Sequence, residues 1–370
     1  MRKNGGQLLA LLRDNGAMSR ADLARAIGVS APALTKIASS QLERGLIAEA
    51  DSSSSSGLGR PGTLINLRPS SCYVVGANVG AGRVGVVLAD MMLNVVARKS
   101  FTFDFDAVGV DEIIAKTAKA INALIDKSGL PRQAIKGMGV GVPGKVDRAG
   151  RSNVSSKFTQ WLHDIPFADQ LEQLLDLPVV LEHNATAMAL AEAFYGAGRG
   201  YGTVLHLYLR AGLGAGLVHA RHGELVHPGP VEIGHIVIDP DGQPCQCGGR
   251  GCVETVFSEA ALLRAMSLSQ VPSTGLIAAA MDSPDVWEPA YARFLEALST
   301  TVTLLGPDLI LLGGHLGEAP AALLDALNAD LPKRLMPQFR GVRVARATLQ
   351  PDAGALGAAC VGLEKFVFEG

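Results

Sequence analysis

The sequence predicts an α/β protein with two similar lobes, preceded by a small helix-turn-helix unit with a strand wing. Two observations lead to this prediction. A series of strand, glycine turn, strand, turn and strand occurs twice, once from Tyr73 and again from Thr203. Residues 1–68 instead show short segments whose apolar residues recur with helical spacing. We therefore place a first domain at residues 1–68 and a two-lobed domain at residues 69–370.

The repeated plan is visible in the segments themselves. The first lobe reads YVVGANVG, GRVGVVLAD and LNVVARKSF, followed by a helix at residues 110–128 and the strand IKGMGVGVPG. The second lobe reads TVLHLYLRAG, LGAGLVHA and GELVHPG. Two copies of one unit predict two lobes that face each other across a cleft, where small ligands bind.

Length and composition narrow the classes of protein that fit. A chain of 370 residues is long enough for two or three domains with hydrophobic cores. No run of about 18 apolar residues occurs, so we expect no membrane span. The N-terminal stretch MRKNGGQLLALLRDNG lacks the long apolar core and the cleavage site of a secretory signal. We expect a cytoplasmic protein, in which thiols stay reduced.

Two capped helices are predicted in the first domain. Ser19 precedes RADLARAI with Asp22 three residues later, as in a capping box, and Gly28 ends that helix. Ser30 opens APALTKIASSQLER, which ends near Gly45. The strands LIAEA and TLINL follow, on either side of five serines and the tip GLGRPG.

The second of these helices is a candidate DNA-recognition helix. Its outward residues are small or hydrogen-bonding, so the helix could lie deep in a major groove. Arg60, in the glycine- and proline-rich tip, could reach the minor groove. Residues 1–68 carry nine Lys or Arg and five Asp or Glu, a net charge of +4. One alternative is that these helices form a small protein-interaction domain. The other is that the positive net charge of residues 1–68 arises by chance. The predicted DNA-contacting residues are Ser30, Ala33, Thr35, Lys36, Ser39 and Arg60.

Three of the five cysteines fall in one short stretch. Cys245, Cys247 and Cys252 follow His235, and three thiolates with one imidazole complete a tetrahedral zinc site with no open position. Reduced free thiols and a redox centre are the alternatives, and His222 and His227 are competing fourth ligands. We predict a structural zinc ion. Such an ion would fix the loop without taking part in a reaction.

Two glutamates flank the predicted metal loop. Glu232 lies three residues before His235, and Glu254 lies two residues after Cys252 at the start of a predicted helix, ETVFSEAALLRAM. Paired carboxylates beside a cleft are good acceptors for sugar hydroxyls. The alternative for Glu254 is that its charge only favours the N-terminus of that helix.

These motifs together resemble the ROK family (repressors, open reading frames and kinases). The resemblance runs from about Tyr73 to the C-terminus and is carried by EIGH, CQCGGRGCVET, GVGVPG and LEHNATAMALAEAFYGAGRG. The helix-turn-helix is similar to that of the repressor branch, which includes the N-acetylglucosamine and xylose repressors. The resemblance implies an actin-like, sugar-kinase-type fold of two lobes and a sugar or sugar-phosphate ligand near the zinc loop.

The resemblance also implies the sugar-contacting residues. His235 would both bind zinc and contact the sugar, and Gly144 and Ser156 match weaker positions. The predicted sugar-binding set is Gly144, Ser156, His183, Asn184, Glu232, His235 and Glu254.

Four segments depart from the kinases of the family. The D-I-G-G-T of the kinases reads NVGAG at residues 78–82, and their N-D reads His183–Asn184. An amide cannot act as a base near neutral pH. The second phosphate loop reads RAG at residues 210–212, and the nucleotide-side GGG reads GGH at residues 313–315. All four changes fall on the phosphoryl-transfer side, so we expect no catalytic residues.

The resulting prediction is a sugar-responsive transcriptional regulator, most simply a repressor of carbohydrate genes without kinase activity. Its partners would be double-stranded operator DNA, a sugar or sugar-phosphate effector and further copies of itself, as a homodimer or a dimer of dimers. The alternatives are an ATP-dependent sugar kinase of the same family and a structural regulator without a ligand.

Overall fold

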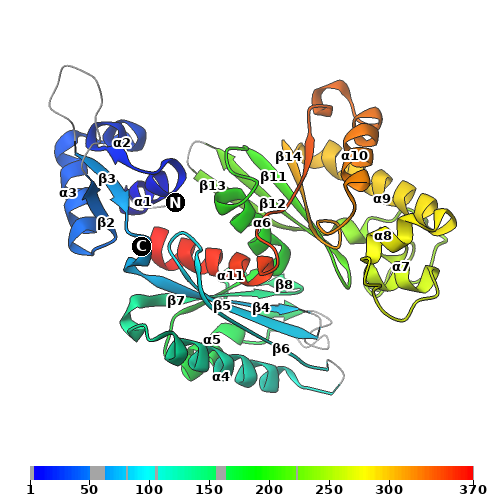
Figure 1. Ribbon diagram of the computed structural model, residues 1–370, viewed down its shortest axis with the longest axis horizontal. Helices are drawn as coiled ribbons and strands as arrows, with labels where there is room; N and C mark the ends of the chain where they lie inside the picture. The colour runs from blue at the N-terminus through cyan, green and yellow to red at the C-terminus, as the bar shows by residue number, and fades with distance from the viewer. Residues whose placement is uncertain are drawn as a thin grey trace. The chain divides into compact units, whose positions relative to one another are not determined.

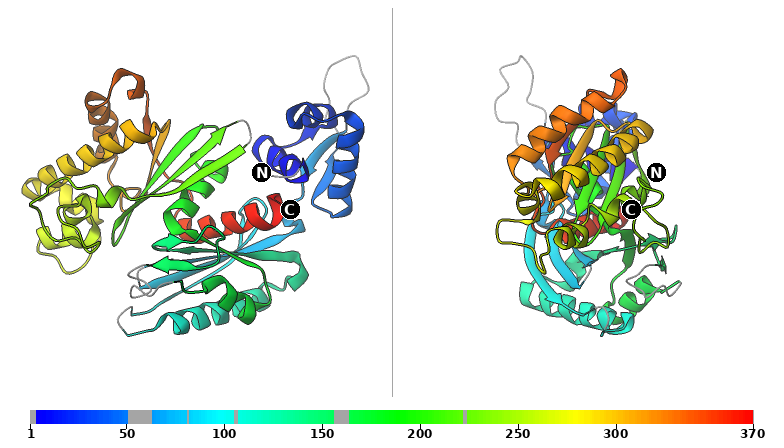
Figure 2. Two further views of the ribbon diagram at one scale, coloured as in Figure 1. Left: turned by 180° about the vertical axis from the view of Figure 1, so that it is seen from behind. Right: turned by 90° about the vertical axis from the view of Figure 1, so that its right-hand side faces the viewer.

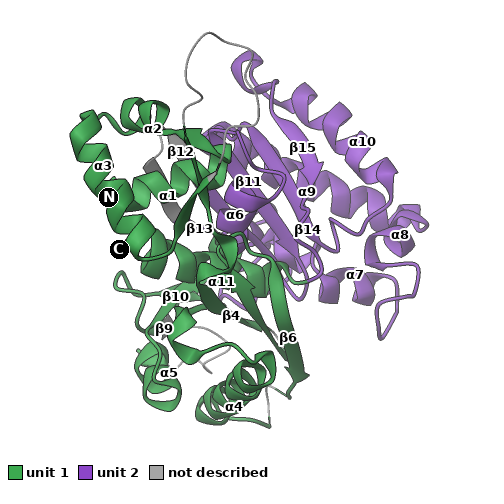
Figure 3. Ribbon diagram, turned by 60° about the vertical axis from the view of Figure 1, so that its left-hand side comes forward, with its two compact units in different colours: residues 1–187, 222–224, 352–370 green, residues 188–221, 225–351 purple. Residues whose placement is uncertain are grey.

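The computed structural model describes residues 4–50, 63–80, 82–104, 107–155, 164–221 and 224–369 (Figures 1 and 2). The chain forms two compact units (Figure 3). Unit 1 comprises residues 1–187, 222–224 and 352–370, and unit 2 comprises residues 188–221 and 225–351. In the described part of the chain, no helix is both long and apolar enough to cross a membrane.

The N-terminal part of unit 1 is the predicted helix-turn-helix with its wing strands. A three-stranded sheet, in the order β1-β3-β2, accompanies three helices. The expected strands LIAEA and TLINL are β2 and β3, whereas β1 was not predicted because two residues carry no periodic pattern. The elements are α1 (Asn4–Asn15), β1 (Met18–Ser19), α2 (Arg20–Ile27), α3 (Ala31–Glu43), β2 (Ile47–Ala50) and β3 (Leu64–Leu67).

The predicted helix caps are confirmed. The Ser19 hydroxyl accepts a hydrogen bond of 3.1 Å from the Asp22 amide and donates one of 2.7 Å to the Asp22 carboxylate. Gly28 ends α2 with a φ of +78°, which glycine adopts without steric cost. The Ser30 hydroxyl accepts from the Ala33 amide and so caps α3.

The rest of unit 1 is built on a five-stranded sheet in the order β10-β7-β4-β5-β6. Strands β4, β7 and β10 are parallel to one another, and β4, β5 and β6 form an antiparallel series. Helices α4 and α5 cover one face of the sheet and α11 covers the other (Figure 1). The elements are η1 (Pro69–Ser71), β4 (Tyr73–Gly80), β5 (Arg83–Asp90), β6 (Val95–Thr102), α4 (Val110–Ser128), η2 (Arg132–Ala134), β7 (Ile135–Val142), β8 (Lys145–Val146), β9 (Asn153–Ser155), α5 (Phe167–Leu175), β10 (Val179–His183), α11 (Ala353–Leu363) and η8 (Glu364–Phe368).

The two faces of this sheet carry different side chains because strand residues alternate in direction. Val75 and Ala77 of β4 belong to the apolar core that includes α4. Gly76 and Gly139 face α11, and a Cβ at either position would lie within 2.1 Å of an α11 backbone oxygen. Glycine therefore lets the helix lie directly on the strands.

Unit 2 repeats the sheet order with strands β13-β12-β11-β14-β15. Here β11 pairs antiparallel with β12 and parallel with β14, as β4 pairs with β5 and β7 in unit 1. The predicted repetition of one plan is thus confirmed. The elements are α6 (Asn184–Tyr195), which begins in unit 1, β11 (Thr203–Leu209), β12 (Leu213–Arg221), β13 (Glu224–Val231), η4 (Ile233–His235), η5 (Val253–Thr255), α7 (Glu259–Ala265), α8 (Leu276–Met281), α9 (Pro284–Leu305), β14 (Leu309–Gly314), α10 (Ala321–Asp330), η6 (Leu331–Arg334), η7 (Pro337–Phe339) and β15 (Arg343–Arg346).

Gly139→Ala should destabilise unit 1, because the new methyl group would lie 1.9 Å from the Ala358 carbonyl oxygen. We expect the free energy of unfolding to fall by about 1–3 kcal/mol, the usual cost of overpacking. Urea unfolding followed by circular dichroism measures this change. Gly85→Ala is the matched control, because a Cβ there meets nothing within 4 Å. Equal losses in the two variants would contradict the proposed packing.

Candidate functional site

Four predicted metal ligands lie together in unit 2. The ligand atoms of His235, Cys245, Cys247 and Cys252 are all within 4.8 Å of one another. The Cys245 sulfur is 3.6 Å from Nδ1 of His235, and the Cys247 sulfur is 3.7 Å from the Cys252 sulfur. The four side chains form a group that could hold a metal ion.

These two distances match edges of a metal tetrahedron. Zinc lies about 2.3 Å from sulfur and about 2.0–2.1 Å from nitrogen, so a sulfur–sulfur edge is about 3.8 Å and a sulfur–nitrogen edge about 3.6 Å. The distance between the Cys247 and Cys252 sulfurs is too long for a disulfide, whose sulfurs are bonded at about 2.0 Å. His235 is therefore the histidine that joins the three cysteines. Of its two predicted competitors, His222 lies outside the described residues, as does the side chain of His227.

Backbone pairing explains why the cysteine loop closes. Val237 bridges Cys252, and the Val253 amide donates a 3.0 Å hydrogen bond to the Ile236 carbonyl. Gly251 has a φ of +63°, and a Cβ there would lie 1.5 Å from the Asp239 carbonyl oxygen. The loop therefore needs glycine where the two flanking segments run side by side.

Glu254 is held beside the turn that joins β11 to β12. Its carboxylate accepts a 2.9 Å hydrogen bond from the Leu213 amide, and a Cβ on Gly212 would lie 2.4 Å from the same oxygen. Glu254 lies in the short turn η5. The expectation that it begins a helix is wrong, because Ser258 caps α7 by accepting from the Ala261 amide, and α7 starts at Glu259.

Glu232 lies in the neighbouring segment of unit 2. It directly precedes η4, which ends at His235. A Cβ on Gly234 would lie 3.2 Å from the Glu254 carboxylate, so the segment that carries Glu232 passes close to Glu254. The metal ligands and both glutamates thus belong to one part of unit 2.

Two predicted sugar contacts, His183 and Asn184, lie with Asn78 of the altered phosphate loop at or near the carboxyl ends of the parallel strands of unit 1, which is where ligands bind in open α/β sheets. Asn78 pairs with Gly141 across β4 and β7, and His183 ends β10 next to Asn184, where α6 begins. Nδ1 of His183 and Oδ1 of Asn78 are buried and have no hydrogen-bond partner among the described residues.

The corresponding edge of unit 2 contains a cluster that the sequence did not predict. Arg210 follows β11 and forms ion pairs with Glu318, and its guanidinium lies 3.1 Å from Nδ1 of His315. His315 is 4% exposed, and its Nε2 is 2.6 Å from the Glu259 carboxylate. No sequence motif indicated Glu259 or Glu318, because they come from separate segments. We call these four residues the Arg210 cluster.

The predicted DNA-contacting residues are only partly described. Ser30, Thr35 and Lys36 are exposed on or beside α3, while Ala33 and Ser39 are half-buried. Leu34, Ala38 and Gln41 form the buried side of the helix. Arg60 and the predicted sugar contact Ser156 lie outside the described residues. Gly144 is described and has a φ of +80°.

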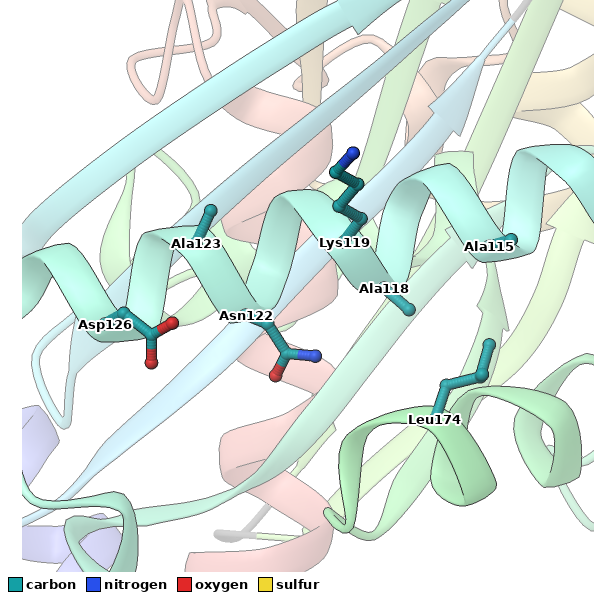
Figure 4. Close-up of a pocket in the computed structure, with 7 residues that line it drawn as sticks. All are labelled: Ala115, Ala118, Lys119, Asn122, Ala123, Asp126 and Leu174. Carbon is teal, nitrogen blue, oxygen red and sulfur yellow. The ribbon is translucent and has the colours of Figure 1, made fainter.

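A shallow hollow on unit 1 offers little chemistry. Figure 4 shows that its lining side chains come from the outer surface of α4, with one residue from α5. They include one cation and one carboxylate, Lys119 and Asp126, two turns apart, with no buried polar group. The lining residues are Ala115, Ala118, Lys119, Asn122, Ala123, Asp126 and Leu174.

Burial lowers the pKa of His183 and that of His206 to about 4 in each case. Between pH 6.5 and 4 the unfolded chain therefore binds protons that the folded chain does not, so stability falls as the pH falls. His206→Gln removes one such group and should flatten the decline by on the order of 3 kcal/mol. Urea unfolding of both proteins between pH 7 and 4 checks this. The metal-ligand group is present in both the wild-type protein and the variant, so its titration affects both equally. Parallel plots of stability against pH would therefore contradict the lowered pKa of His206.

The purified protein should contain one divalent metal ion per chain, measured by inductively coupled plasma mass spectrometry. Cys252→Ala should remove it, because a tetrahedral site loses one of four ligands. Cys72→Ala is the matched control, since this thiol lies outside the group. Equal metal content in the two variants would exclude the proposed ligand set.

Comparison with known proteins identifies the family of this chain. The ROK family model matches residues 74–365. A glucokinase from Thermotoga maritima is 31% identical over 70% of this chain and 87% of its own length. The DNA-binding transcriptional repressor Mlc of Escherichia coli is 25% identical over 97% of this chain and 92% of its own length. A crystal structure of a ROK family transcriptional regulator homologous to the E. coli Mlc protein superimposes with a TM-score of 0.82, covering 99% of this chain and 96% of the other at 21% identity. The chain belongs to the ROK family.

Proposed function

We propose that this protein is a DNA-binding transcriptional repressor whose affinity for its operator is set by a sugar, and that it does not phosphorylate that sugar. The observation that carries the proposal is the capped helix-turn-helix in front of a ROK fold. The similarity to the repressor Mlc includes this N-terminal part, whereas the glucokinase matches 70% of the chain.

The DNA-binding role rests on the surface of α3. Thr35 and Lys36 are exposed, and the small residues beside them leave the helix narrow enough for a major groove. A homodimer would present two such helices about 34–36 Å apart, one turn of DNA. This arrangement has two-fold symmetry, as an operator with two half-sites does, and it is the reason for the predicted homodimer or dimer of dimers.

The proposed metal is zinc, held by His235, Cys245, Cys247 and Cys252. Four protein ligands leave no position for a reacting molecule, so zinc would only hold the loop. Nδ1 of His235 faces Cys245, which leaves Nε2 to donate to a sugar hydroxyl. The same loop holds Glu254 beside Gly212 and Leu213, and a second carboxylate is available from Glu232.

The proposed sugar contacts come from both units. Unit 2 supplies Glu232, His235 and Glu254. Unit 1 would supply Gly144, Ser156, His183 and Asn184. That these seven residues bind one sugar together stays a prediction.

Two features argue against phosphoryl transfer. Asn184 cannot take a proton from a sugar hydroxyl near neutral pH, and loss of a general base costs about 10²–10⁴-fold in rate. The Arg210 cluster lies at the carboxyl ends of β11 and β14, where the nucleotide would bind by the family resemblance. The buried imidazole of His315 takes up space there, and the carboxylates of Glu259 and Glu318 would repel a triphosphate.

The second candidate is an ATP-dependent sugar kinase. The similarity to the Thermotoga maritima glucokinase and the presence of Glu232 and Glu254 favour it. The two candidates differ in one readout, the release of ADP in the presence of sugar.

The decisive experiment uses the full chain and a DNA duplex that the protein itself selects from a random library. We expect one of glucose, xylose and N-acetylglucosamine to change the affinity for this duplex by about 5- to 150-fold, a typical range for coupled sites. Glu232→Gln should abolish the response. Fluorescence anisotropy measures the affinity, and a coupled assay measures ADP.

Glu288→Gln, an exposed change on α9 of the same unit, is the matched control and should keep the response. ADP release above background that Glu232→Gln abolishes would overturn the proposal in favour of the kinase. A chain that selects no duplex would exclude the repressor.

A further inference from the structure

The first helix of the DNA-binding part is fixed to the last segment of the chain. Arg13 of α1 is 2% exposed, and its guanidinium lies 2.7 Å from the Glu364 carboxylate of η8 and 5.1 Å from the centre of the Phe368 ring. Gly6 of the same helix lies against the Phe368 backbone, where a Cβ would be 1.6 Å from the carbonyl oxygen. Arg13 also pairs with Asp14 of its own helix at 2.7 Å, and Glu364 is the carboxylate that joins its buried guanidinium to η8.

Segment η8 continues directly from α11, so the two form one helical rod. Every residue of α11 is buried except Gly354, which is half-buried. Besides the close contacts at Gly76 and Gly139, a Cβ on Gly137 would lie 2.4 Å from the Phe366 ring of η8. Such interlocked packing moves as a body and does not deform gradually.

The opposite end of the rod reaches the carboxyl ends of the parallel strands of unit 1, which we call the ligand edge of this unit. A Cβ on Gly354, in the first turn of α11, would lie 2.6 Å from the Asn78 side chain. Asn78 in turn lies 2.9 Å from the Cβ position of Gly141, which is 3.5 Å from Asn184. Oδ1 of Asn78 has no hydrogen-bond partner in the described part of the chain, so a ligand that donates to it would act on the contact between Asn78 and Gly354.

We propose that α11 and η8 couple the ligand edge of unit 1 to the DNA-binding helices, with Arg13 and Glu364 as the positioning residues that transmit the change. The inference rests on the proposed function for the identity of the ligand, but the mechanical coupling is independent of it. The whole path lies within unit 1. A ligand that prefers one position of the rod would shift the DNA-binding helices with it.

The first test needs neither sugar nor DNA. Gly354→Ala displaces the Asn78 end of the rod, and hydrogen exchange of the full chain reports on residues 4–43 at the other end. We expect this variant to speed exchange in α1 by at least about fivefold, the lower end of typical couplings. Gly85→Ala is the matched control and should leave exchange in α1 unchanged, since its Cβ meets nothing within 4 Å.

Arg13→Met then tests the route of transmission. If Arg13 transmits the change, Gly354→Ala should add nothing to the exchange rates of the Arg13→Met protein. Independent, multiplicative effects of the two substitutions would overturn the proposal, and so would a Gly354→Ala protein with faster exchange around Asn78 and unchanged exchange in α1.

The second test uses the selected duplex and the sugar panel. Glu364→Gln keeps the shape of the side chain and lies at the opposite end of the rod from Gly354. It should leave the sugar affinity measured by calorimetry unchanged, while the sugar-dependent change in DNA affinity falls from its wild-type ratio to near 1. A full response in Glu364→Gln would overturn the coupling. A wild-type protein without any response would overturn the proposed function, and the exchange experiment would still decide the coupling.

Discussion

The convergence of His235 and three cysteines on one point is the constraint on which the candidate site depends. The loop between these ligands is rich in glycine, and its apolar residues Ile236 and Ile238 pack against the hydrophobic core. Once the ligands meet, the segment before His235 and the segment after Cys252 lie side by side and pair through the Val253 amide. Glu232 and Glu254 belong to these two segments. Their positions agree with this pairing, and the Leu213 amide also holds the Glu254 carboxylate.

The two units have the same sheet order but differ at the carboxyl ends of their parallel strands. In unit 1 that edge contains buried polar atoms of Asn78 and His183 without partners among the described residues. In unit 2 the edge is filled by ion pairs and hydrogen bonds among Arg210, His315, Glu259 and Glu318. One edge has hydrogen-bonding capacity to offer a ligand, and the other has satisfied its own. This asymmetry is the structural basis for proposing a sugar ligand and no phosphoryl transfer.

Much of the fold could be predicted because local chemistry determines it. The caps Ser19 and Ser30 use hydrogen bonds within four residues, and helix 110–128 has its apolar residues at helical spacing, so the sequence alone predicts all three. The cysteine spacing likewise predicts the metal group. The Arg210 cluster could not be predicted, because its members lie on segments that are far apart in the sequence. They meet only once β11 and β14 pair side by side in the sheet. The contact between Arg13 and Glu364 joins residues 351 positions apart, and nothing local marks either one.

The central claim is that a metal-held loop binds a sugar in a protein that does not transfer phosphate. Calorimetric titration of the sugar panel into the metal-loaded full chain, with Mg²⁺ and ATP present and ADP measured in the same sample, tests this claim most directly. We predict saturable heat with one sugar, loss of that heat in Cys252→Ala, and no ADP above background. Sugar-dependent ADP release, or unchanged sugar heat in a metal-free Cys252→Ala protein, would contradict the account.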